Sequence, residues 1–207
     1  MSGVRIKICG ITSIEDAENA VDLGADFIGL NFWSESPRRV DVALARRIAE
    51  AVRGRTSIVG VFVNGDRDDV MTIESEVGLD LIQFHGDETP RDLAPWGERA
   101  VKALRFEGDL SPEVLDDYET VWGFVVEPSR ESYGGTGKGW NYAQARKLPR
   151  HKPFLLAGGL RPANVARAVA ASSPWGVDVC SGVESAPGVK DSKALWEFFT
   201  EVRGAAG

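Results

Sequence analysis

The sequence predicts one domain over residues 1–207, an α/β fold of the closed (β/α)8 TIM-barrel type. Short β-rich runs alternate with helical patterns from one end of the chain to the other, and there are eight such units. In a chain of 207 residues each unit averages roughly 26 residues, near the lower size limit of this barrel. An open, doubly wound sheet is the alternative, and the count of eight units favours the barrel.

Short apolar runs predict the first four strands, at residues 4–8, 27–32, 57–63 and 81–85. Thr12 and Glu15 form a capping-box pattern that starts the first helix. Thr89 followed by Pro90 is a cap with proline at the first helical position, which starts the fourth helix. Apolar spacing predicts the second and third helices, at Leu44, Ala45, Ile48, Ala49 and Val52 and at Val70, Ile73 and Val77.

The remaining strands are predicted at residues 101–104, 121–126, 154–157 and 177–180. Ser111 and Pro112 repeat the helix-start pattern of the fourth helix. The last helix has an apolar stripe of Leu195, Phe198, Phe199 and Val202. The longest irregular stretch, residues 128–139, follows the sixth strand. In a barrel such a βα loop lies on the catalytic face, and its length suggests a substrate lid.

Composition excludes several classes of partner. There are 31 acidic residues against 24 Lys and Arg, whereas nucleic-acid binding needs a clustered basic surface. No apolar run approaches the roughly 20 residues that cross a bilayer, and the N-terminus lacks the apolar region of a signal peptide. The two cysteines and two histidines show no metal-ligand spacing. We therefore expect a reduced, cytoplasmic, metal-free protein, either a monomer or a homodimer.

Glycine-rich turns follow the sixth, seventh and eighth predicted strands. Glycine lets backbone N–H groups approach a ligand closely, and the amides of turns bind anions, although glycine also occurs in tight βα turns for structural reasons alone. Because barrels commonly bind phosphate near the last two strands, the three turns predict a phosphorylated small molecule as ligand. The predicted phosphate-binding residues are Gly135, Thr136, Gly137, Gly158, Gly159, Ser181 and Gly182.

Titratable side chains at strand ends are the candidates for chemistry. Cys9 is a base or nucleophile if nearby charge lowers its pKa, or else a small buried apolar side chain. Glu127 and Asp178 are acid/base candidates, and Asp178 is equally suited to accept loop amides. His85 is a proton carrier, an oxyanion donor or a plain loop histidine. Arg38 is either a clamp for a carboxylate or a solvated surface residue.

Seven short motifs occur in order along the chain: Lys7–Thr12, Asn31–Phe32 with Ser36–Arg38, Gly60–Asn64, Gln83–Gly86, Gly134–Gly137, Ala157–Asn164 and Asp178–Glu184. Together they resemble the phosphoribosylanthranilate isomerase family of tryptophan biosynthesis, and they cover essentially the whole chain. A single Gly-Gly-Thr-Gly segment would mean little, but seven motifs in order are specific.

This resemblance implies an Amadori rearrangement of N-(5-phosphoribosyl)anthranilate, in which an aldose-type aminosugar becomes a ketose-type one without metal or organic cofactor. It implies that Glu127 protonates the ribose ring oxygen. The Cys9 thiolate then removes the C2 proton, and the resulting enolamine tautomerises to the ketone. Arg38 would bind the anthranilate carboxylate and the glycine turns the phosphate, with His85 and Asp178 also contacting the substrate.

Three positions depart from the family pattern. Glu127 stands where aspartate is usual, Cys180 where a serine is common, and residues 140–142 are Trp-Asn-Tyr in place of Phe-Asp-Trp. The alternatives are another phosphate-binding barrel enzyme or a phosphometabolite-binding relic without turnover. A pentose-phosphate epimerase would need more histidines. An indole-glycerol-phosphate synthase would need catalytic lysines; Lys7 and Lys102 are the nearest candidates, and neither lies at the carboxyl end of a predicted strand.

Closure of the barrel adds one expectation about the cysteines. The eighth strand pairs with the first, so Cys9 and Cys180 should lie near one another at the same rim. In a reducing compartment both should be thiols. The hypothesis is that oxidation links them and silences the enzyme reversibly.

Overall fold

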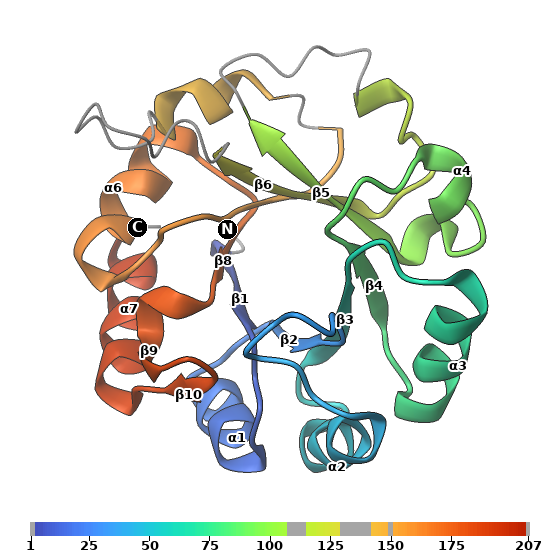
Figure 1. Ribbon diagram of the computed structural model, residues 1–207. Helices are drawn as coiled ribbons and strands as arrows, with labels where there is room; N and C mark the ends of the chain where they lie inside the picture. Colours follow the sequence, from blue (N-terminus) through green and yellow to red (C-terminus); the bar gives the residue numbers. More distant parts are fainter. Residues whose placement is uncertain (1–2, 107–114, 129–141, 149–150, 206–207) are drawn as a thin grey trace.

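Eight parallel strands form a closed barrel in the computed structural model, which describes residues 3–106, 115–128, 142–148 and 151–205. The strands follow the chain order, and β1 pairs with both β2 and β8. Figure 1 looks along the barrel and shows the helices arranged around its outside. The predicted fold class is confirmed.

The strands agree with the predicted ranges, with ends that shift by one or two residues. Because of these shifts, Cys9 is the last residue of β1 and Glu127 lies within β6. The strands are β1 Arg5–Cys9, β2 Phe27–Asn31, β3 Ser57–Phe62, β4 Leu81–Phe84, β5 Ala100–Phe106, β6 Gly123–Pro128, β7 Phe154–Leu156 and β8 Gly176–Val179.

The helices carry apolar faces that pack against the barrel, as the spacing of their apolar residues predicts. Figure 1 shows them side by side around the sheet. The α-helices are α1 Ile14–Asp22, α2 Val42–Val52, α3 Arg67–Val77, α4 Pro90–Leu93, α6 Pro162–Ser172 and α7 Ser192–Ala205, and the 3-10 helices are η1 Gly97–Arg99, η3 Tyr142–Lys147 and η4 Ser181–Val183.

The predicted start of the first helix is wrong by one residue. Ser13 is the N-cap, and its side chain accepts a hydrogen bond of 3.1 Å from the Asp16 N–H. The Thr12 hydroxyl donates instead to the Gly188 carbonyl, a partner far away in the sequence. The predicted start at Pro90 is confirmed, whereas Ser111, Pro112 and most of the predicted lid lie outside the described residues.

A two-stranded hairpin was not predicted. It consists of β9 Glu184–Ala186 and β10 Val189–Lys190, which pair antiparallel between β8 and α7. Figure 1 shows the hairpin outside the barrel, near α7 and α1. It returns Lys190 to the end of β1, where the Lys190 side chain is buried and hydrogen-bonds the Cys9 carbonyl.

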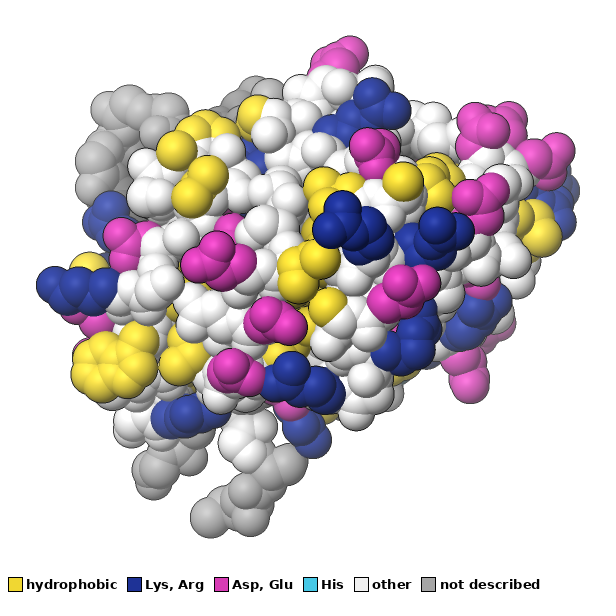
Figure 2. Space-filling view, turned by 90° about the horizontal axis from the view of Figure 1, so that it is seen from below, with side chains coloured by type: hydrophobic (Ala, Val, Ile, Leu, Met, Phe, Trp, Pro, Cys, Tyr) yellow, Lys and Arg dark blue, Asp and Glu magenta, His cyan; other side chains and the backbone are white. Residues whose placement is uncertain are grey.

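The surface has charges of both signs. Figure 2 shows Lys and Arg side chains interspersed with Asp and Glu on the face seen from below Figure 1. Across the ranges that the structure describes, we found no helix with both the length and the apolar character needed to span a bilayer.

Candidate active site

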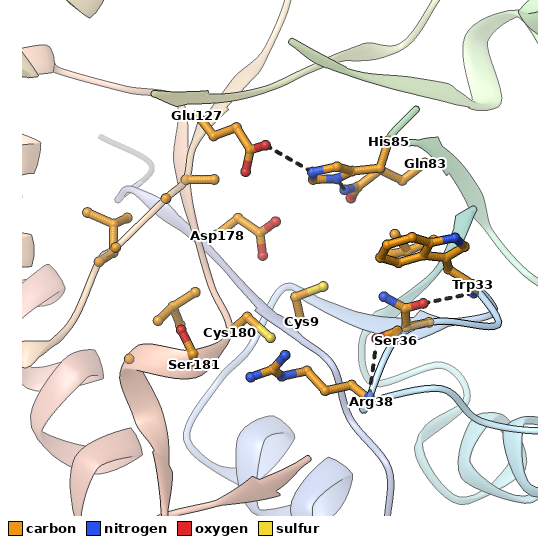
Figure 3. A pocket seen from close by; sticks show the side chains of 18 of the residues that line it. Cys9, Trp33, Ser36, Arg38, Gln83, His85, Glu127, Asp178, Cys180 and Ser181 are labelled. Atoms are coloured by element: carbon orange, nitrogen blue, oxygen red, sulfur yellow. Dashed lines mark hydrogen bonds and ion pairs between the residues drawn. The ribbon is translucent and has the colours of Figure 1, made fainter. Parts of the chain in front are cut away.

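A cavity of about 630 Å³ opens at the carboxyl ends of the barrel strands. Its volume lies within the roughly 300–1,000 Å³ typical of small-molecule sites. Figure 3 shows side chains from several strands and their following loops pointing into it. The predicted site residues in the described part of the chain all line it: Cys9, Arg38, His85, Glu127, Gly158, Gly159, Asp178, Ser181 and Gly182. The predicted residues Gly135, Thr136 and Gly137 lie outside the described residues.

Cys9 lies among groups that favour its thiolate. Hydrogen bonding between the Cys9 and Cys180 sulfurs is the largest influence that lowers the Cys9 pKa, and the Cys180 S–H also has Glu184 Oε1 as an acceptor, at 3.8 Å. Burial opposes the shift, but the nearby charges of Lys7, Lys190 and His85 also lower it, and the Cys9 pKa falls well below its ordinary value. The same hydrogen bond, together with burial, raises the pKa of Cys180, which therefore stays a thiol.

Asp178 and Lys7 form a buried ion pair near Cys9. Lys7 Nζ lies 2.9 Å from Asp178 Oδ2, and the two side chains are only 1% and 7% exposed. Burial raises the pKa of Asp178 to about 6, although the charge of Lys7 opposes the rise. The other oxygen, Asp178 Oδ1, is buried and accepts no hydrogen bond from the described residues. Asp178 therefore has an acceptor available at the wall of the cavity.

Glu184 joins two cations at the rim between β1 and β8. Arg38 donates to it through Nε at 2.9 Å and Nη2 at 2.7 Å, and Lys190 Nζ donates at 2.8 Å. Burial raises the pKa of Glu184, but the hydrogen bonds from Arg38 and Lys190 outweigh burial and hold it at about 2. The carboxylate in turn raises the pKa of Arg38. The structure thus places Arg38 in a partly buried ion-pair network and not in the solvated surface position that was the alternative prediction.

His85 bridges β4 and β6. Gln83 Nε2 lies 2.8 Å from His85 Nδ1, and His85 Nε2 lies 3.2 Å from Glu127 Oε1. With the Gln83 amide donating to Nδ1, the neutral imidazole carries its hydrogen on Nε2 and donates it to Glu127. Burial lowers the pKa of His85, but the hydrogen bond and charge of Glu127 raise it more, so the pKa lies above its ordinary value.

The glycine turns after β7 and β8 touch one another and the end of β6. A Cβ atom on Gly182 would overlap the Leu160 carbonyl, and one on Gly158 would overlap the Pro128 ring. Gly158 also has a positive φ of 82°, which glycine adopts without strain. These turns are therefore packed closely enough that only glycine fits, and their backbones border the cavity.

Sequence reasoning missed Lys190, Gln83 and the influence of Lys7 on Cys9. Gln83 belongs to the same short motif as His85 and lies two residues before it. Side chains two residues apart on a strand point to the same face, so the sequence could have placed Gln83 beside His85. Lys190 carried no local signal, because only the hairpin brings it to the site. In the described ranges, no group of three or more His, Cys, Asp or Glu side chains is arranged to hold a metal ion.

A family model and relatives of similar sequence agree on one family. Residues 6–201 match a family model described as N-(5'-phosphoribosyl)anthranilate (PRA) isomerase. An N-(5'-phosphoribosyl)anthranilate isomerase from Pseudomonas fluorescens is 44% identical over 207 residues, which cover 98% of this chain and 100% of that protein.

Two solved structures have the same fold over nearly the full length. The phosphoribosyl anthranilate isomerase of Thermus thermophilus has a TM-score of 0.86 and 35% identity, over 97% of this chain and 99% of that one. A second isomerase, in complex with reduced 1-(o-carboxyphenylamino)-1-deoxyribulose 5-phosphate, has a TM-score of 0.81 and 32% identity, with the same coverage of both chains.

Proposed function

This chain belongs to the N-(5'-phosphoribosyl)anthranilate isomerase family of tryptophan biosynthesis, and on that premise we propose that Cys9 is its general base and Glu127 its general acid. The observation that carries the proposal is the electrostatic environment of Cys9, which favours a thiolate at the mouth of the barrel. Only the thiolate form of cysteine accepts a proton from carbon.

The reaction begins with ring opening. Glu127 gives a proton to the ribose ring oxygen as the bond from that oxygen to C1 breaks, and the anthranilate nitrogen supplies the electron pair that forms a C1=N bond. The hydrogen bond from His85 to Glu127 supports this role, because it stabilises the carboxylate that remains after proton donation.

The second half of the reaction moves protons at C2, at its hydroxyl and at C1. The Cys9 thiolate removes the proton on C2, and electrons flow toward the C1=N bond to give a neutral enolamine. The enolamine then loses its C2 hydroxyl proton and gains one on C1, which yields the ketone. Cys9 has gained one proton and Glu127 has lost one, so the cycle closes when one proton returns from the thiol to the carboxylate.

Binding of the substrate rests on three groups of contacts. Arg38 shares one N–H edge with Glu184, and a guanidinium has further N–H donors for the anthranilate carboxylate. Asp178 Oδ1 suits a sugar hydroxyl, since it is a buried acceptor. The glycine turns with Gly158, Gly159, Ser181 and Gly182 suit the phosphate, and the bound 5-phosphate compound of a relative supports this class of ligand.

The test is turnover of freshly prepared N-(5'-phosphoribosyl)anthranilate, followed by the loss of anthranilate-type fluorescence. Cys9→Ser should keep the fold and bind a product analogue, yet lose several orders of magnitude in kcat, because a serine hydroxyl is not ionised near neutral pH. Cys180→Ser is the matched control and should retain far more activity. Turnover of Cys9→Ser within tenfold of the unsubstituted enzyme would remove Cys9 from the mechanism. An unsubstituted protein that binds a phosphate analogue without turnover would be a relic.

A further inference from the structure

We infer that Lys7 is a positioning residue for the proposed reaction: its buried ammonium lies near the Cys9 sulfur and holds that sulfur as the thiolate. Lys7 does not line the cavity, so it acts through Cys9 and not on the substrate. The inference rests on the proposed role of Cys9 as base, and it concerns what makes that base available.

The first observation is the position of the two atoms. A Cβ atom built on Gly29 would lie 2.9 Å from Cys9 Sγ and 3.2 Å from Lys7 Nζ. The sulfur and the ammonium therefore occupy the same small space over β2, and that space exists because residue 29 has no side chain. Lys7 and Cys9 are two residues apart on β1, so both side chains point to the same face of the strand.

The second observation is how the other charges near Cys9 are paired. The groups that act electrostatically on Cys9 are Lys7, Arg38, His85, Asp178, Cys180 and Lys190. Arg38 and Lys190 are both hydrogen-bonded to Glu184, and His85 is hydrogen-bonded to Glu127. Lys190 also donates to Cys9, but its acceptor there is the backbone carbonyl and not the sulfur.

Lys7 is thus the cation whose ammonium shares the space over Gly29 with the sulfur. Its one carboxylate partner among the described residues is Asp178, at 2.9 Å. Burial lowers the pKa of Lys7, but the charges of Asp178 and Cys9 raise it more, so it stays protonated. Apart from the His85–Glu127 pair, the described cations around Cys9, which are Lys7, Arg38 and Lys190, outnumber the carboxylates Asp178 and Glu184 by one. A thiolate at Cys9 balances the cluster.

The experiment measures the pKa of the Cys9 thiol directly and needs no turnover. The chain has two cysteines, so Cys180→Ser leaves Cys9 as the sole thiol. The pH dependence of its alkylation by iodoacetamide then gives its pKa. In this background Lys7→Met should raise the thiol pKa by about one unit or more, which slows alkylation about tenfold at a pH below both values. Lys7→Arg keeps the charge and should restore most of the shift.

Two further variants make the result specific. Asp178→Asn removes the carboxylate that competes for Lys7, so it should lower the thiol pKa, the opposite sign to Lys7→Met. If Lys7→Met fails to fold, the shift of the thiol pKa in Asp178→Asn still tests the role of Lys7. Lys102→Met is the matched control: Lys102 is another buried lysine, paired with Glu88 at 2.8 Å, and its loss should leave the thiol pKa unchanged.

The kinetic counterpart separates positioning from simple loss of structure. In otherwise unsubstituted enzyme, Lys7→Met should lower kcat with little change in KM and move the acid limb of the pH profile upward with the thiol pKa. An unchanged thiol pKa in Lys7→Met, or a rise in Asp178→Asn, would overturn the inference while leaving the role of Cys9 intact. Substantial turnover by Cys9→Ser would instead overturn the proposed mechanism, whatever Lys7 does to the thiol.

Discussion

Position 127 carries a glutamate where the resemblance led us to expect aspartate, and the neighbouring side chains accommodate it. The side chain of Glu127 is longer by one methylene, about 1.5 Å of extra reach. His85 holds one of its oxygens at 3.2 Å, and Gln83 fixes the ring of His85 in turn. A partly buried hydrogen-bonded series of this kind orients the carboxyl group.

Two substitutions at this position separate acid catalysis from anchoring of the loop. Glu127→Gln keeps the shape and removes the acidic proton, so kcat should collapse while a product analogue binds nearly as before. Glu127→Asp should retain measurable activity, reduced because a misplacement of 1 Å costs on the order of 10²-fold. Fluorescence-based turnover and analogue titration measure both. Near-normal turnover by Glu127→Gln would show that another group donates the proton.

Glu184 predicts a specific dependence of stability on pH. Its folded-state pKa is about 2, below the roughly 4.3 of an unfolded glutamate, so the unfolded state binds more protons between those values. The stabilisation is therefore present above about pH 4.3 and is lost as the pH falls toward 2. Glu184→Gln should cost about 2 kcal/mol at pH 7, since it removes charge-assisted hydrogen bonds. That cost should shrink on acidification.

Urea unfolding at a series of pH values measures this difference. Glu197→Gln is the control, because its pair with Lys193 is exposed and spans 3.6 Å, a kind of contact that contributes about 0–1 kcal/mol. A constant difference between Glu184→Gln and the unsubstituted protein from pH 7 to pH 3 would contradict the assigned role of the carboxylate.

At the scale of elements, the seam between β1 and β8 determines what surrounds Cys9. In the pairing of β1 with β8, Lys7 lies opposite Asp178 and Ile8 lies opposite Val179. The next residues along the two strands, Cys9 and Cys180, are therefore neighbours. Neighbouring strands are about 4.8 Å apart, within the ~4.4–6.8 Å between Cα atoms that a disulfide spans. The hairpin of β9 and β10 closes the outer side of this seam with Lys190 and Glu184.

This seam makes the two cysteines a candidate redox pair. Diamide should oxidise the two thiols to one disulfide, with two protons and two electrons passing to the diamide, which becomes a hydrazine. Turnover should stop and return after dithiothreitol, because the disulfide consumes the proposed base. Thiol titration of the unfolded protein should fall from two groups to none. Two remaining thiols after inactivation, or equal inactivation of Cys180→Ser, would rule the cross-link out.

At the scale of the whole molecule, one closed sheet connects the first strand to the last. Interior side chains of the barrel form a buried cluster that includes Phe27, and this ring packs against Trp122 and Trp175 with centroids 5.7 and 5.9 Å away. Lys7 and Lys102 are also buried there, and each ammonium is paired with a carboxylate. The barrel therefore has no internal boundary at which half of it could be removed without exposing this cluster.

We accordingly propose a single domain over residues 1–207 and expect it to unfold as one unit. Tryptophan fluorescence reports on the barrel through Trp122 and Trp175, while far-UV circular dichroism reports mainly on the outer helices. The two signals should follow coincident transitions in urea. Separate midpoints would indicate that parts of the barrel unfold independently and would contradict the single-domain assignment.

Local pattern was sufficient to predict the barrel and the titratable residues Cys9, His85, Glu127 and Asp178 that line its cavity. Strands and helices follow from period and capping over a few residues, and parallel strands that close into a barrel bring all their carboxyl ends to one face. Cys9, His85, Glu127 and Asp178 are therefore recognisable as strand-end residues from the sequence alone. The exact helix start at Ser13 is not, because the competing partner of Thr12 is Gly188, far along the chain.

The charge state of the site was decided only by tertiary structure. Lys7 meets Asp178 across 171 positions in the sequence, and Lys190 reaches the Cys9 carbonyl across 181. Such pairs carry no local signal, because their geometry depends on closure of the sheet and on the return of the hairpin. Sequence determined which side chains reach the mouth of the barrel. Burial and long-range pairing determined which of them carry charge, since desolvation and nearby ions set each pKa.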